Sequence, residues 1–355
     1  MRVSLSNSDR SFSAAPDRPV LDAALDAGLR LAHSCRSGNC GSCRARLVGG
    51  AIDYPQGRPL GLSDGEIADG YVLLCQARAQ TDLELELHEI RRADEALIKR
   101  LPCRVERAER LAHDVTGLHL RLPAAEEFKF EAGQYIDVLL SGGRRRSFSI
   151  ASPPHDSKLL ELHVRRVAGG EFSARIFAAD PLHALLSIEG PHGRFFYRPP
   201  EGVGAGEGAG AAPLLLVGGG TGYAPLNSLL RTLVERSARR EITLYWGVRA
   251  ERDLYADAQI RELQSRSDAF AYVPVLSEPS QDWRGRRGLV HEAVLSDLDR
   301  LDRHDIYASG PPQMIAALRR EFAAHGARAS RLFFDSFDYA TDSLERQRSS
   351  SATKS

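Results

Sequence analysis

The sequence predicts three consecutive domains: a small α+β domain, an antiparallel β-barrel and a doubly wound parallel α/β domain. Short segments with a two-residue hydrophobic period fill the middle of the chain, separated by Gly and Pro clusters. In the last third, apolar runs alternate with helix-like stretches. The 355 residues suffice for two or three domains. The predicted domains are 1–92, 97–200 and 213–340, with a Gly/Ala-rich linker at 201–212 and a polar, disordered tail at 341–355.

Composition excludes several classes of protein. The chain has 47 basic and 47 acidic residues, whereas nucleic-acid-binding proteins usually carry a basic excess. No apolar run reaches the roughly 20 residues of a membrane span. The N-terminus alternates polar and apolar residues and does not resemble a secretory signal. We therefore expect a cytoplasmic protein, in which clustered cysteines bind metal or carry out redox chemistry rather than form disulfides.

The first domain has the pattern of a small mixed sheet with one helix. A hairpin is predicted around Asn7–Arg10, and a helix is predicted after Pro19, a residue typical of helix starts. Leu83, Leu85 and Leu87 alternate with polar residues and predict a closing strand.

Four cysteines of the first domain have a distinctive spacing. Cys35, Cys40 and Cys43 form a C-x4-C-x2-C run, and Cys75 follows much later in the chain. This is the plant-type ferredoxin spacing for a [2Fe–2S] cluster. Glycines within the run keep the loop small, so that the backbone can wrap closely around the cluster and direct N–H groups at its sulfur atoms.

A structural zinc site is the competing interpretation of these cysteines. Zinc motifs usually bring two closely spaced pairs together, and here only Cys40 and Cys43 form such a pair. The three-plus-one arrangement therefore favours iron and sulfide. The fifth cysteine, Cys103, lies in an apolar predicted strand, and we interpret it as a small buried side chain.

The segment Cys35–Cys43 resembles the cluster loop of reductases that fuse a ferredoxin domain to a ferredoxin–NADP reductase-like module. This resemblance implies a β-grasp ferredoxin domain, a flavin-binding barrel and a nicotinamide-binding domain, in that order. It covers about Arg2 to Phe337, and the two remaining blocks carry further matching motifs.

The flavin motif of this family, Arg-x-Tyr-Ser/Thr, resembles Arg146-Ser147-Phe148-Ser149. The resemblance implies that Arg146 pairs with a flavin phosphate through its bidentate fork. Phe148, which replaces the usual Tyr, would lie against the flavin ring, and Ser149 would hydrogen-bond near flavin N5. Ser147 lies within the same motif and is a further flavin-binding candidate.

A second flavin signal follows the motif. Gly169 and Gly170 precede a predicted helix over Phe172–Ala179, which includes Ser173. A helix N-terminus can seat a phosphate, although two glycines before a helix are by themselves more often a plain turn. The order of the domains in the family favours FAD over FMN.

The third domain opens with a strand, a glycine-rich turn and a helix predicted to start at Pro225. This arrangement is typical of a pyrophosphate-binding site. The strict G-x-G-x-x-G pattern is absent, but the segment resembles the family's Gly-Gly-x-Gly-x-x-Pro version. The candidate dinucleotide-binding residues in this segment are Gly219, Gly220, Thr221, Gly222 and Pro225.

Further candidates follow the later strands of this domain. The family motif beginning with Cys is here Ser309-Gly310-Pro311, so a hydroxyl replaces the thiol beside the nicotinamide, and we expect slower or retuned hydride transfer. Arg249 could face a 2′-phosphate, but a lone Arg after a strand is usually a solvated charge, and the resemblance favours NADH over NADPH. Phe337 could lie against the flavin or belong to the core.

Together these motifs predict an NAD(P)H-dependent reductase that moves electrons from NADH through FAD to a [2Fe–2S] cluster and on to a partner enzyme. Within the family, the chain most resembles reductases that serve a CDP-hexulose dehydratase of deoxysugar biosynthesis. The alternative partner is an aromatic-ring oxygenase or monooxygenase. Two other hypotheses remain open: a non-catalytic electron relay with a decayed nicotinamide site, and a free-flavin reductase. No partner nucleic acid or membrane is expected.

Overall fold

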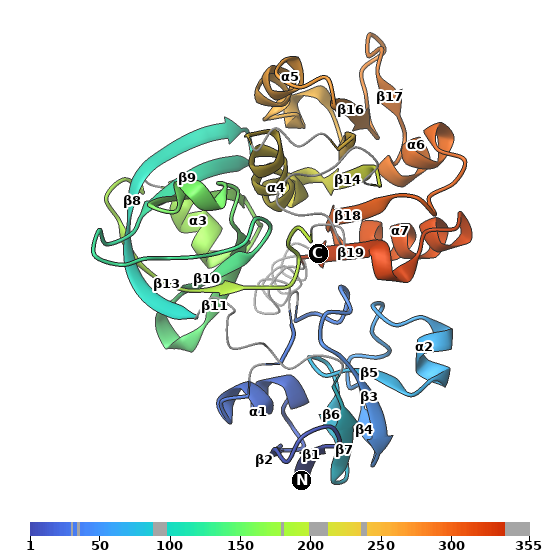
Figure 1. Ribbon diagram of the computed structural model, residues 1–355. Coiled ribbons are helices and arrows are strands. Elements are labelled where there is room, and N and C mark those ends of the chain that lie inside the picture. Colours follow the sequence, from blue (N-terminus) through green and yellow to red (C-terminus); the bar gives the residue numbers. More distant parts are fainter. Residues whose placement is uncertain are drawn as a thin grey trace, which may run out of the picture. The chain divides into compact units, whose positions relative to one another are not determined.

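The computed structural model describes residues 1–29, 31–33, 36–87, 98–178, 181–198, 212–235 and 240–337 (Figure 1). The chain divides into two compact units. The first is built from Met1–Glu95 with Phe334–Asp338, and the second is centred on Ala96–Phe333. The predicted tail, all but one residue of the predicted linker, and Cys35 lie outside the described residues.

The first unit contains a five-stranded mixed sheet with strand order β2-β1-β7-β3-β5. Strands β1 and β7 pair in parallel, and the other neighbours in this sheet are antiparallel. The elements are β1 (Arg2–Leu5), β2 (Ser11–Ser13), α1 (Val20–Asp26), β3 (Arg44–Gly49), β4 (Ile52–Asp53), α2 (Asp64–Ala68), β5 (Tyr71–Leu73), β6 (Arg78–Ala79) and β7 (Leu83–Glu86).

Local sequence explains the two helices of this unit. Pro19 precedes α1 with a φ of −56°, and the helix buries Val20, Leu21 and Ala24 against the sheet. Helix α2 begins with a capping box, in which the side chains of Ser63 and Glu66 each bond the other residue's backbone N–H. The predicted opening hairpin, helix and closing strand are therefore all present.

The barrel of the second unit is a six-stranded antiparallel sheet with strand order β11-β10-β13-β8-β9-β12. An antiparallel bridge between Ile150 and Leu162 joins the two edge strands and closes the sheet on itself. The elements are β8 (Lys99–Ala112), β9 (Val115–Arg121), β10 (Tyr135–Leu139), η1 (Ser141–Gly143), β11 (Arg145–Ser149), η2 (Pro154–Asp156), β12 (Leu159–Arg165), α3 (Glu171–Ala178) and β13 (Leu185–His192).

A further six-stranded sheet has the strand order β17-β16-β15-β14-β18-β19. In Figure 1, α4 and α5 lie on one side of this sheet and α6 and α7 on the other. The elements are β14 (Leu214–Gly219), η3 (Gly220–Gly222), α4 (Tyr223–Glu235), β15 (Ile242–Val248), η4 (Glu251–Asp253), α5 (Asp257–Ser265), β16 (Phe270–Leu276), β17 (Arg286–Arg287), α6 (Val290–Asp297), β18 (Asp305–Gly310), α7 (Pro312–Ala324), η5 (Ala329–Arg331) and β19 (Leu332–Ser336).

The direction of winding in this sheet reverses at β14. The chain passes from β14 to β15 and β16 on one side and later returns to β18 on the other, and each of these pairs is parallel. The carboxyl ends of β14 and β18 therefore flank the crevice in which doubly wound sheets bind ligands. Helix α4 begins at Tyr223, two residues before the predicted start, because a 3-10 turn leads into it; Pro225 is tolerated in its first turn.

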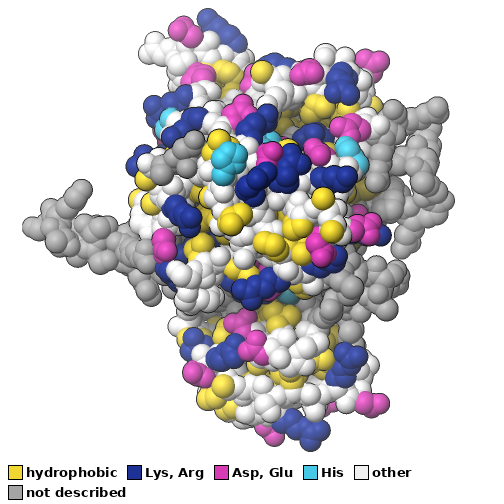
Figure 2. Space-filling view, turned by 90° about the vertical axis from the view of Figure 1, so that its left-hand side faces the viewer, with side chains coloured by type: hydrophobic (Ala, Val, Ile, Leu, Met, Phe, Trp, Pro, Cys, Tyr) yellow, Lys and Arg dark blue, Asp and Glu magenta, His cyan; other side chains and the backbone are white. Residues whose placement is uncertain are grey.

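Charge is distributed without a dominant sign on the face of the molecule over the barrel. Figure 2 shows Lys and Arg side chains interspersed with Asp and Glu side chains on this face. Partly exposed ion pairs of the barrel include Arg104–Glu106 and Lys99–Glu126. None of the helices that the structure describes is both long and apolar enough to cross a membrane.

Candidate functional site: a cysteine loop, a flavin strand and a nicotinamide crevice

The cysteine loop of the first unit has the properties required of a cluster site. Cys40, Cys43 and Cys75 are buried and are not joined by a disulfide. The N–H of Ser42 donates to Cys40 Sγ at 3.5 Å, as expected where loop amides point at sulfur. Gly38, at φ +77°, adopts the left-handed conformation that glycine permits.

Two other segments of the same unit hold this loop. The side-chain amide of Gln76, the residue after Cys75, donates to the carbonyl of Arg36 at 2.8 Å. Gly61 N donates to Gly38 O at 2.7 Å, and a Cβ at Gly61 would lie only 2.6 Å from that oxygen. The loop is thus fastened directly to the segment that carries the distant cysteine.

The fifth cysteine is outside this arrangement. Cys103 lies on β8 in the barrel core, and burial raises the pKa of its thiol to about 12. A thiol that stays protonated is a poor nucleophile and a poor metal ligand. This environment agrees with its interpretation as a small core side chain.

The predicted flavin residues lie together on β11. Because side chains alternate along a strand, Arg146 and Phe148 share one face and Ser147 and Ser149 share the other. The ring of Phe148 lies 5.2 Å from that of Phe172 on α3. Ser147 Oγ donates to Asp137 Oδ1 at 2.6 Å within the sheet, so this hydroxyl already has a protein partner.

The glycine turn before α3 is held together by a hydrogen bond between residues on its two sides. Gly169 has a φ of +73°, and Ser173 Oγ accepts a hydrogen bond from Val167 N at 3.1 Å. A Cβ at Gly170 would lie 2.7 Å from this hydroxyl oxygen, so only glycine fits. The predicted helix is therefore present directly after these two glycines, and Ser173 is buried where it braces the turn.

The predicted nicotinamide motifs meet at the carboxyl edge of the second sheet. Gly218 on β14 is paired with Ser309 on β18, and Gly219 is paired with Gly247 on β15. A Cβ at Gly222 would lie 2.1 Å from the backbone oxygen of Ser309. The two glycine motifs are thus in backbone contact, although about 90 residues separate them in the sequence.

The remaining candidates of this domain occupy different environments. The Ser309 side chain is fully buried, and its Oγ has no hydrogen-bond partner among the described residues. A Cβ at Gly310 would lie 2.8 Å from Met314, and Pro311 precedes α7. Arg249 is exposed just beyond β15.

Three further candidates complete the set. Thr221 is half-buried in the glycine turn, and Pro225 is buried in the first turn of α4. Phe337 is half-buried directly after β19.

Three family models match successive parts of the chain. Residues 3–80 match the 2Fe-2S iron-sulfur cluster binding domain. Residues 102–197 match the oxidoreductase FAD-binding domain, and residues 216–320 match the oxidoreductase NAD-binding domain.

Relatives extend this similarity over nearly the whole chain. A CDP-6-deoxy-L-threo-D-glycero-4-hexulose-3-dehydrase reductase from Yersinia pestis is 36% identical, over 95% of this chain and 98% of that protein. A terephthalate 1,2-dioxygenase reductase component from Comamonas sp. is 35% identical, over 95% and 97%. The crystal structure of a cytochrome P450 reductase from Amycolatopsis superposes with a TM-score of 0.72 and 32% identity, covering 96% of this chain and 99% of that one.

The chain belongs to the ferredoxin-fused family of ferredoxin–NADP reductase-like enzymes. It is an NAD(P)H-dependent oxidoreductase whose cofactors are FAD and a [2Fe–2S] cluster. The predicted fold class, cofactors and reaction are confirmed. The chemistry of the donor set fits these groups, because the three described cysteines of the first unit are buried thiols and glycines form the turn after β14.

The structure of this reductase adds contacts that the sequence motifs did not indicate. Arg165, the last residue of β12 in the barrel, lies against the glycine turn: a Cβ at Gly220 would be 2.8 Å from its Nη1 atom. Its Nε atom lies 3.2 Å from Asp114 Oδ2. On the other side of the turn, Trp246 Nε1 donates to Gly220 O at 2.9 Å.

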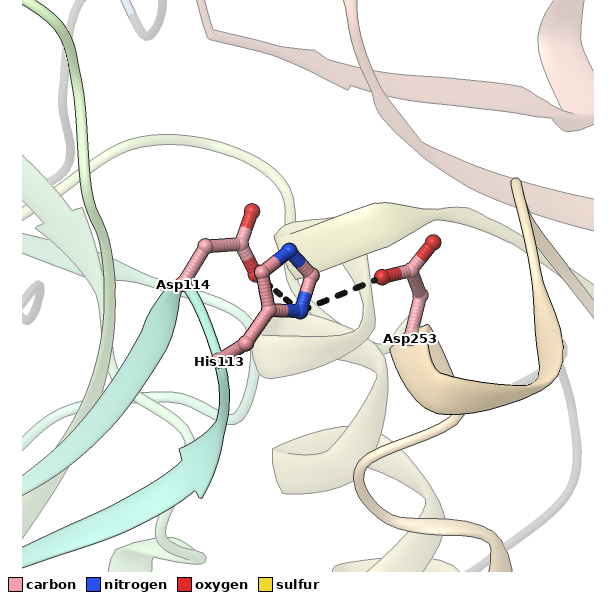
Figure 3. Close-up of side chains that lie close together, drawn as sticks. All are labelled: His113, Asp114 and Asp253. Carbon is pink, nitrogen blue, oxygen red and sulfur yellow. Dashed lines mark ion pairs between the residues drawn. The ribbon is translucent and has the colours of Figure 1, made fainter.

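A histidine beside Asp114 forms a second link between the barrel and the sheet of the reductase. In Figure 3, His113 lies between Asp114 and Asp253, which follow β8 and β15 respectively. Its Nδ1 atom is 3.6 Å from Asp253 Oδ1 and 3.9 Å from Asp114 Oδ1. The side chain of His113 is half exposed, so this contact contributes little to stability.

Glu161 on β12 is a largely buried carboxylate at this boundary. His163 Nε2 donates to Glu161 Oε1 at 3.1 Å, and His163 Nδ1 is hydrogen-bonded to the hydroxyl of Tyr255 at 3.0 Å. Burial raises the pKa of Glu161, but His163 and the cations around it outweigh burial and lower the pKa to about 2. Burial raises the pKa of Tyr255, which keeps its hydroxyl as a donor.

Trp246, Asp253 and Tyr255 lie in two segments, Tyr245–Arg249 and Asp253–Tyr255, that match the family pattern. The other signal was the Arg165-Arg166 pair. Neither pattern indicates by itself which backbone it faces.

Proposed function

We propose that this reductase passes electrons from NADH to a CDP-hexulose dehydratase of deoxysugar biosynthesis. The observation that carries the proposal is the 36% identity to a reductase of that name from Yersinia pestis, which extends over 98% of that protein. NADH is proposed as the donor because Arg249, the one cation suggested for a 2′-phosphate, is an exposed side chain beyond β15.

The proposed cluster ligands are Cys35, Cys40, Cys43 and Cys75. Burial of the three described ligands supports this assignment, as does the amide that donates to Cys40. When bound, the cluster accepts and releases one electron at a time. The chain's own contribution is to hold the four thiolates and to direct N–H groups at sulfur.

The proposed flavin seat is β11 with the turn before α3. Arg146 would pair with a flavin phosphate, Phe148 would cover the ring, and Ser149 would hydrogen-bond to it. Gly169, Gly170 and Ser173 would shape the phosphate side. The position of α3 beside Phe148 supports this grouping.

The proposed dinucleotide seat is the turn from Gly219 to Gly222, with the backbone of Ser309 and Gly310 as its floor. The contact between these backbones supports the assignment, because it brings the two motifs together and only a residue without a Cβ fits at Gly222. Arg165 brings a cation to the same turn, where a pyrophosphate would accept its N–H groups. Ser309 has a buried hydroxyl without a described partner, which suits a position beside the nicotinamide.

An oxygenase is the second candidate partner. The terephthalate dioxygenase reductase component has 35% identity and almost the same coverage, so similarity alone favours the dehydratase only slightly. Electrons would take the same path through this chain to either partner enzyme. The two partners differ only in the surface with which they would accept each electron from the cluster.

A reconstituted assay tests the proposal. The holoenzyme and NADH are supplied with a CDP-hexulose dehydratase and its substrate, or with an aromatic-ring oxygenase and its substrate, and product is measured against NADH consumed. We expect stoichiometric dehydratase product. Productive coupling to the oxygenase alone would overturn the choice of partner, and an unchanged flavin spectrum after anaerobic addition of NADH would support the electron-relay alternative.

Individual variants test the cofactor seats. Arg146→Ala should lose FAD while retaining the iron–sulfur spectrum, and Cys40→Ser should do the reverse. A Cys40→Ser protein that still reduces cytochrome c at the native rate would contradict the proposed path through the cluster and would leave the free-flavin reductase alternative in place.

A further inference from the structure

Two adjacent side chains of α4 bind the backbone directly beyond the flavin strand. Asn227 Nδ2 donates to the carbonyl of Ala151 at 3.1 Å, and Ser228 Oγ donates to the carbonyl of Ser152 at 2.7 Å. Asn227 is 7% exposed and Ser228 is not exposed at all. Both are therefore buried hydrogen bonds between the barrel and the nicotinamide domain. Removing one donor would leave a buried carbonyl without a hydrogen bond, which costs free energy of folding.

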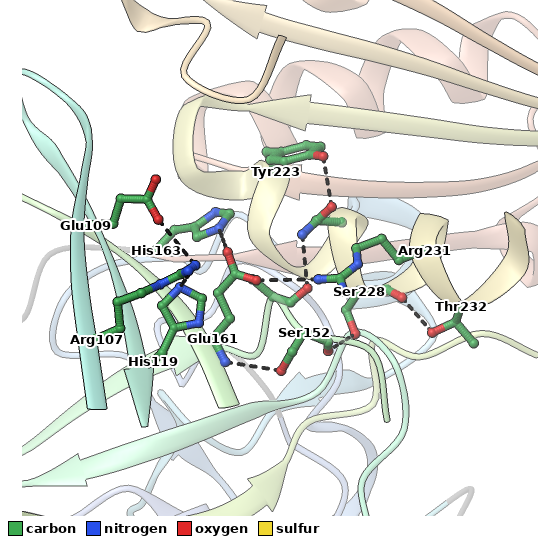
Figure 4. Close-up of polar contacts among 12 residues, drawn as sticks. Arg107, Glu109, His119, Ser152, Glu161, His163, Tyr223, Ser228, Arg231 and Thr232 are labelled. Carbon is green, nitrogen blue, oxygen red and sulfur yellow. Dashed lines mark hydrogen bonds and ion pairs between the residues drawn. The ribbon is translucent and has the colours of Figure 1, made fainter. Parts of the chain in front are cut away.

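Both side chains are themselves held in place. The hydroxyl of Tyr223 donates to Asn227 Oδ1 at 2.9 Å, which fixes the direction of the amide so that its NH2 faces Ala151. Thr232 Oγ1 donates to the backbone oxygen of Ser228 at 2.7 Å. Figure 4 shows these contacts along one side of α4.

A second set of contacts, also drawn in Figure 4, surrounds β12. The contact from Glu161 to Ser152 lies within the barrel, and the other two join β12 to the same helix. Glu161 N donates to Ser152 Oγ at 3.1 Å, and Arg231 Nη1 lies 3.5 Å from Glu161 Oε2. The ring of His163 stacks on that of Tyr223 at a centroid distance of 6.1 Å. We refer to the contacts of Asn227, Ser228 and Arg231 with the barrel as the α4 seam.

The location of the α4 seam connects the two proposed cofactor seats. Helix α4 begins at Tyr223, directly after the glycine turn Gly220–Gly222. Ala151 is two residues beyond Ser149, the end of the flavin strand. A single rigid helix therefore runs from the dinucleotide turn to the backbone that continues from the flavin motif.

We propose that Asn227 and Ser228 are positioning residues for hydride transfer. They would act without touching either cofactor, by fixing the distance between the nicotinamide seat and the flavin strand. The reaction moves one hydride, with two electrons, from nicotinamide C4 to flavin N5, so that NADH becomes NAD⁺ and FAD becomes FADH⁻. The rate depends steeply on this separation, and a displacement of about 1 Å can cost about 100-fold. The proposal rests on the flavin seat proposed above at β11.

Ser228→Ala tests the proposal with the full-length holoenzyme. The variant removes one hydroxyl and leaves the carbonyl of Ser152 without its donor. Flavin bleaching is followed after anaerobic rapid mixing with saturating NADH, at a temperature well below the unfolding midpoint. NADH deuterated at C4 identifies the phase that reports hydride transfer. We expect this phase to slow about 10-fold or more, with the NADH dissociation constant and the FAD content unchanged.

Ser265→Ala is the matched control. Ser265 also lies on a helix of the nicotinamide domain and its hydroxyl also donates to a carbonyl, but that carbonyl belongs to Glu262 of the same helix. The control should retain the native rate. Asn227→Ala provides a second test and should slow the same phase in the same way, including the case in which Ser228→Ala does not fold.

The outcomes separate positioning from stability. A Ser228→Ala enzyme with a lowered unfolding temperature but a hydride-transfer rate within twofold of the native value would overturn the proposal, because the seam would then only add stability. Weaker NADH binding at an unchanged maximal rate would overturn it as well. FAD retained by Arg146→Ala would show that the proposed flavin seat is wrong. That experiment measures cofactor content, whereas the Ser228→Ala experiment measures the hydride-transfer rate, so the failure of one proposal can be told from the failure of the other.

Discussion

The cluster loop and the glycine turn after β14 are both glycine-rich segments pressed against another backbone, yet they are held by different parts of the chain. The cluster loop contacts Gly61 and Gln76, which belong to its own domain. The turn after β14 contacts Ser309 of the neighbouring strand, Trp246 of another and Arg165 of the barrel. The described contacts of the first segment stay within one domain, whereas those of the second come from two.

This difference has a functional meaning. A one-electron carrier needs a stable set of ligands and exposure to its partners, which one small domain provides. Hydride transfer needs two bound cofactors at contact distance, so the residues that set the distance must bridge the domains that bind them. Substitutions in the two sites should therefore separate cleanly into cluster effects and hydride effects.

The largest expected effect tests the second site. Gly222→Ala places a Cβ 2.1 Å from the backbone oxygen of Ser309, which cannot move away as a flexible side chain could. We expect a loss of about 3 kcal/mol in the free energy of unfolding of the second unit and the loss of NADH-dependent flavin bleaching. Denaturant unfolding and anaerobic titration with NADH measure these two quantities. The spectrum of the cluster should be unchanged.

The control for this substitution is Gly65→Ala in α2, where a Cβ would meet no atom within 4 Å. Alanine is favoured over glycine in a helix, so this variant should be neutral or slightly stabilised. If Gly222→Ala reacted with NADH at the native rate, the turn after β14 must be able to rearrange. The close backbone contact would then not distinguish this turn from the cluster loop.

The equivalent test of the first site is Gly61→Ala. The new Cβ would lie 2.6 Å from Gly38 O, so the cluster loop must shift. We expect a cost of about 2 kcal/mol and a lower content of iron and sulfide, with flavin content and flavin bleaching by NADH preserved. Iron and flavin assays on the same purified sample decide the point. Equal losses of both cofactors would mean that the sites are not independent.

An acid titration tests the boundary between barrel and sheet. The pKa of Glu161 falls from an ordinary 4.5 to about 2 on folding, so its stabilising contribution is complete above pH 4.5 and is lost as the pH falls toward 2. This shift corresponds to about 3 kcal/mol at most. Glu161→Gln should flatten the dependence of the unfolding midpoint on pH across that window. An unchanged pH profile would mean that the carboxylate is not stabilised by His163.

The smallest expected effect concerns the bond from Gln76 to Arg36. Gln76→Met keeps the apolar stem over Gly38 and removes the donor, at a cost of about 1 kcal/mol. We expect faster loss of cluster colour in the presence of a chelator, with the maximal rate of flavin reduction unchanged. Gln80→Met, an exposed glutamine of the same unit, is the control and should release the cluster at the native rate.

The sequence alone determined the parts of this protein that depend on local pattern. The cysteine spacing predicted the cluster domain, period-two runs predicted the barrel, and alternating strands and helices predicted the parallel sheet. These signals are readable because each reports a repeat or a spacing along one stretch of chain. The glycine segments at Gly169 and Gly218 also fell where the structure has turns before helices.

The tertiary structure decided which distant residues meet. Gly222 contacts Ser309, Arg165 reaches Gly220, and Asn227 binds the carbonyl of Ala151. These contacts connect residues 55 to 87 positions apart, and no local spacing encodes them. A glutamate, an asparagine or a serine has many possible partners in a sequence, and only the packing of barrel against sheet selects one, because a buried polar group must find its partner within the fold.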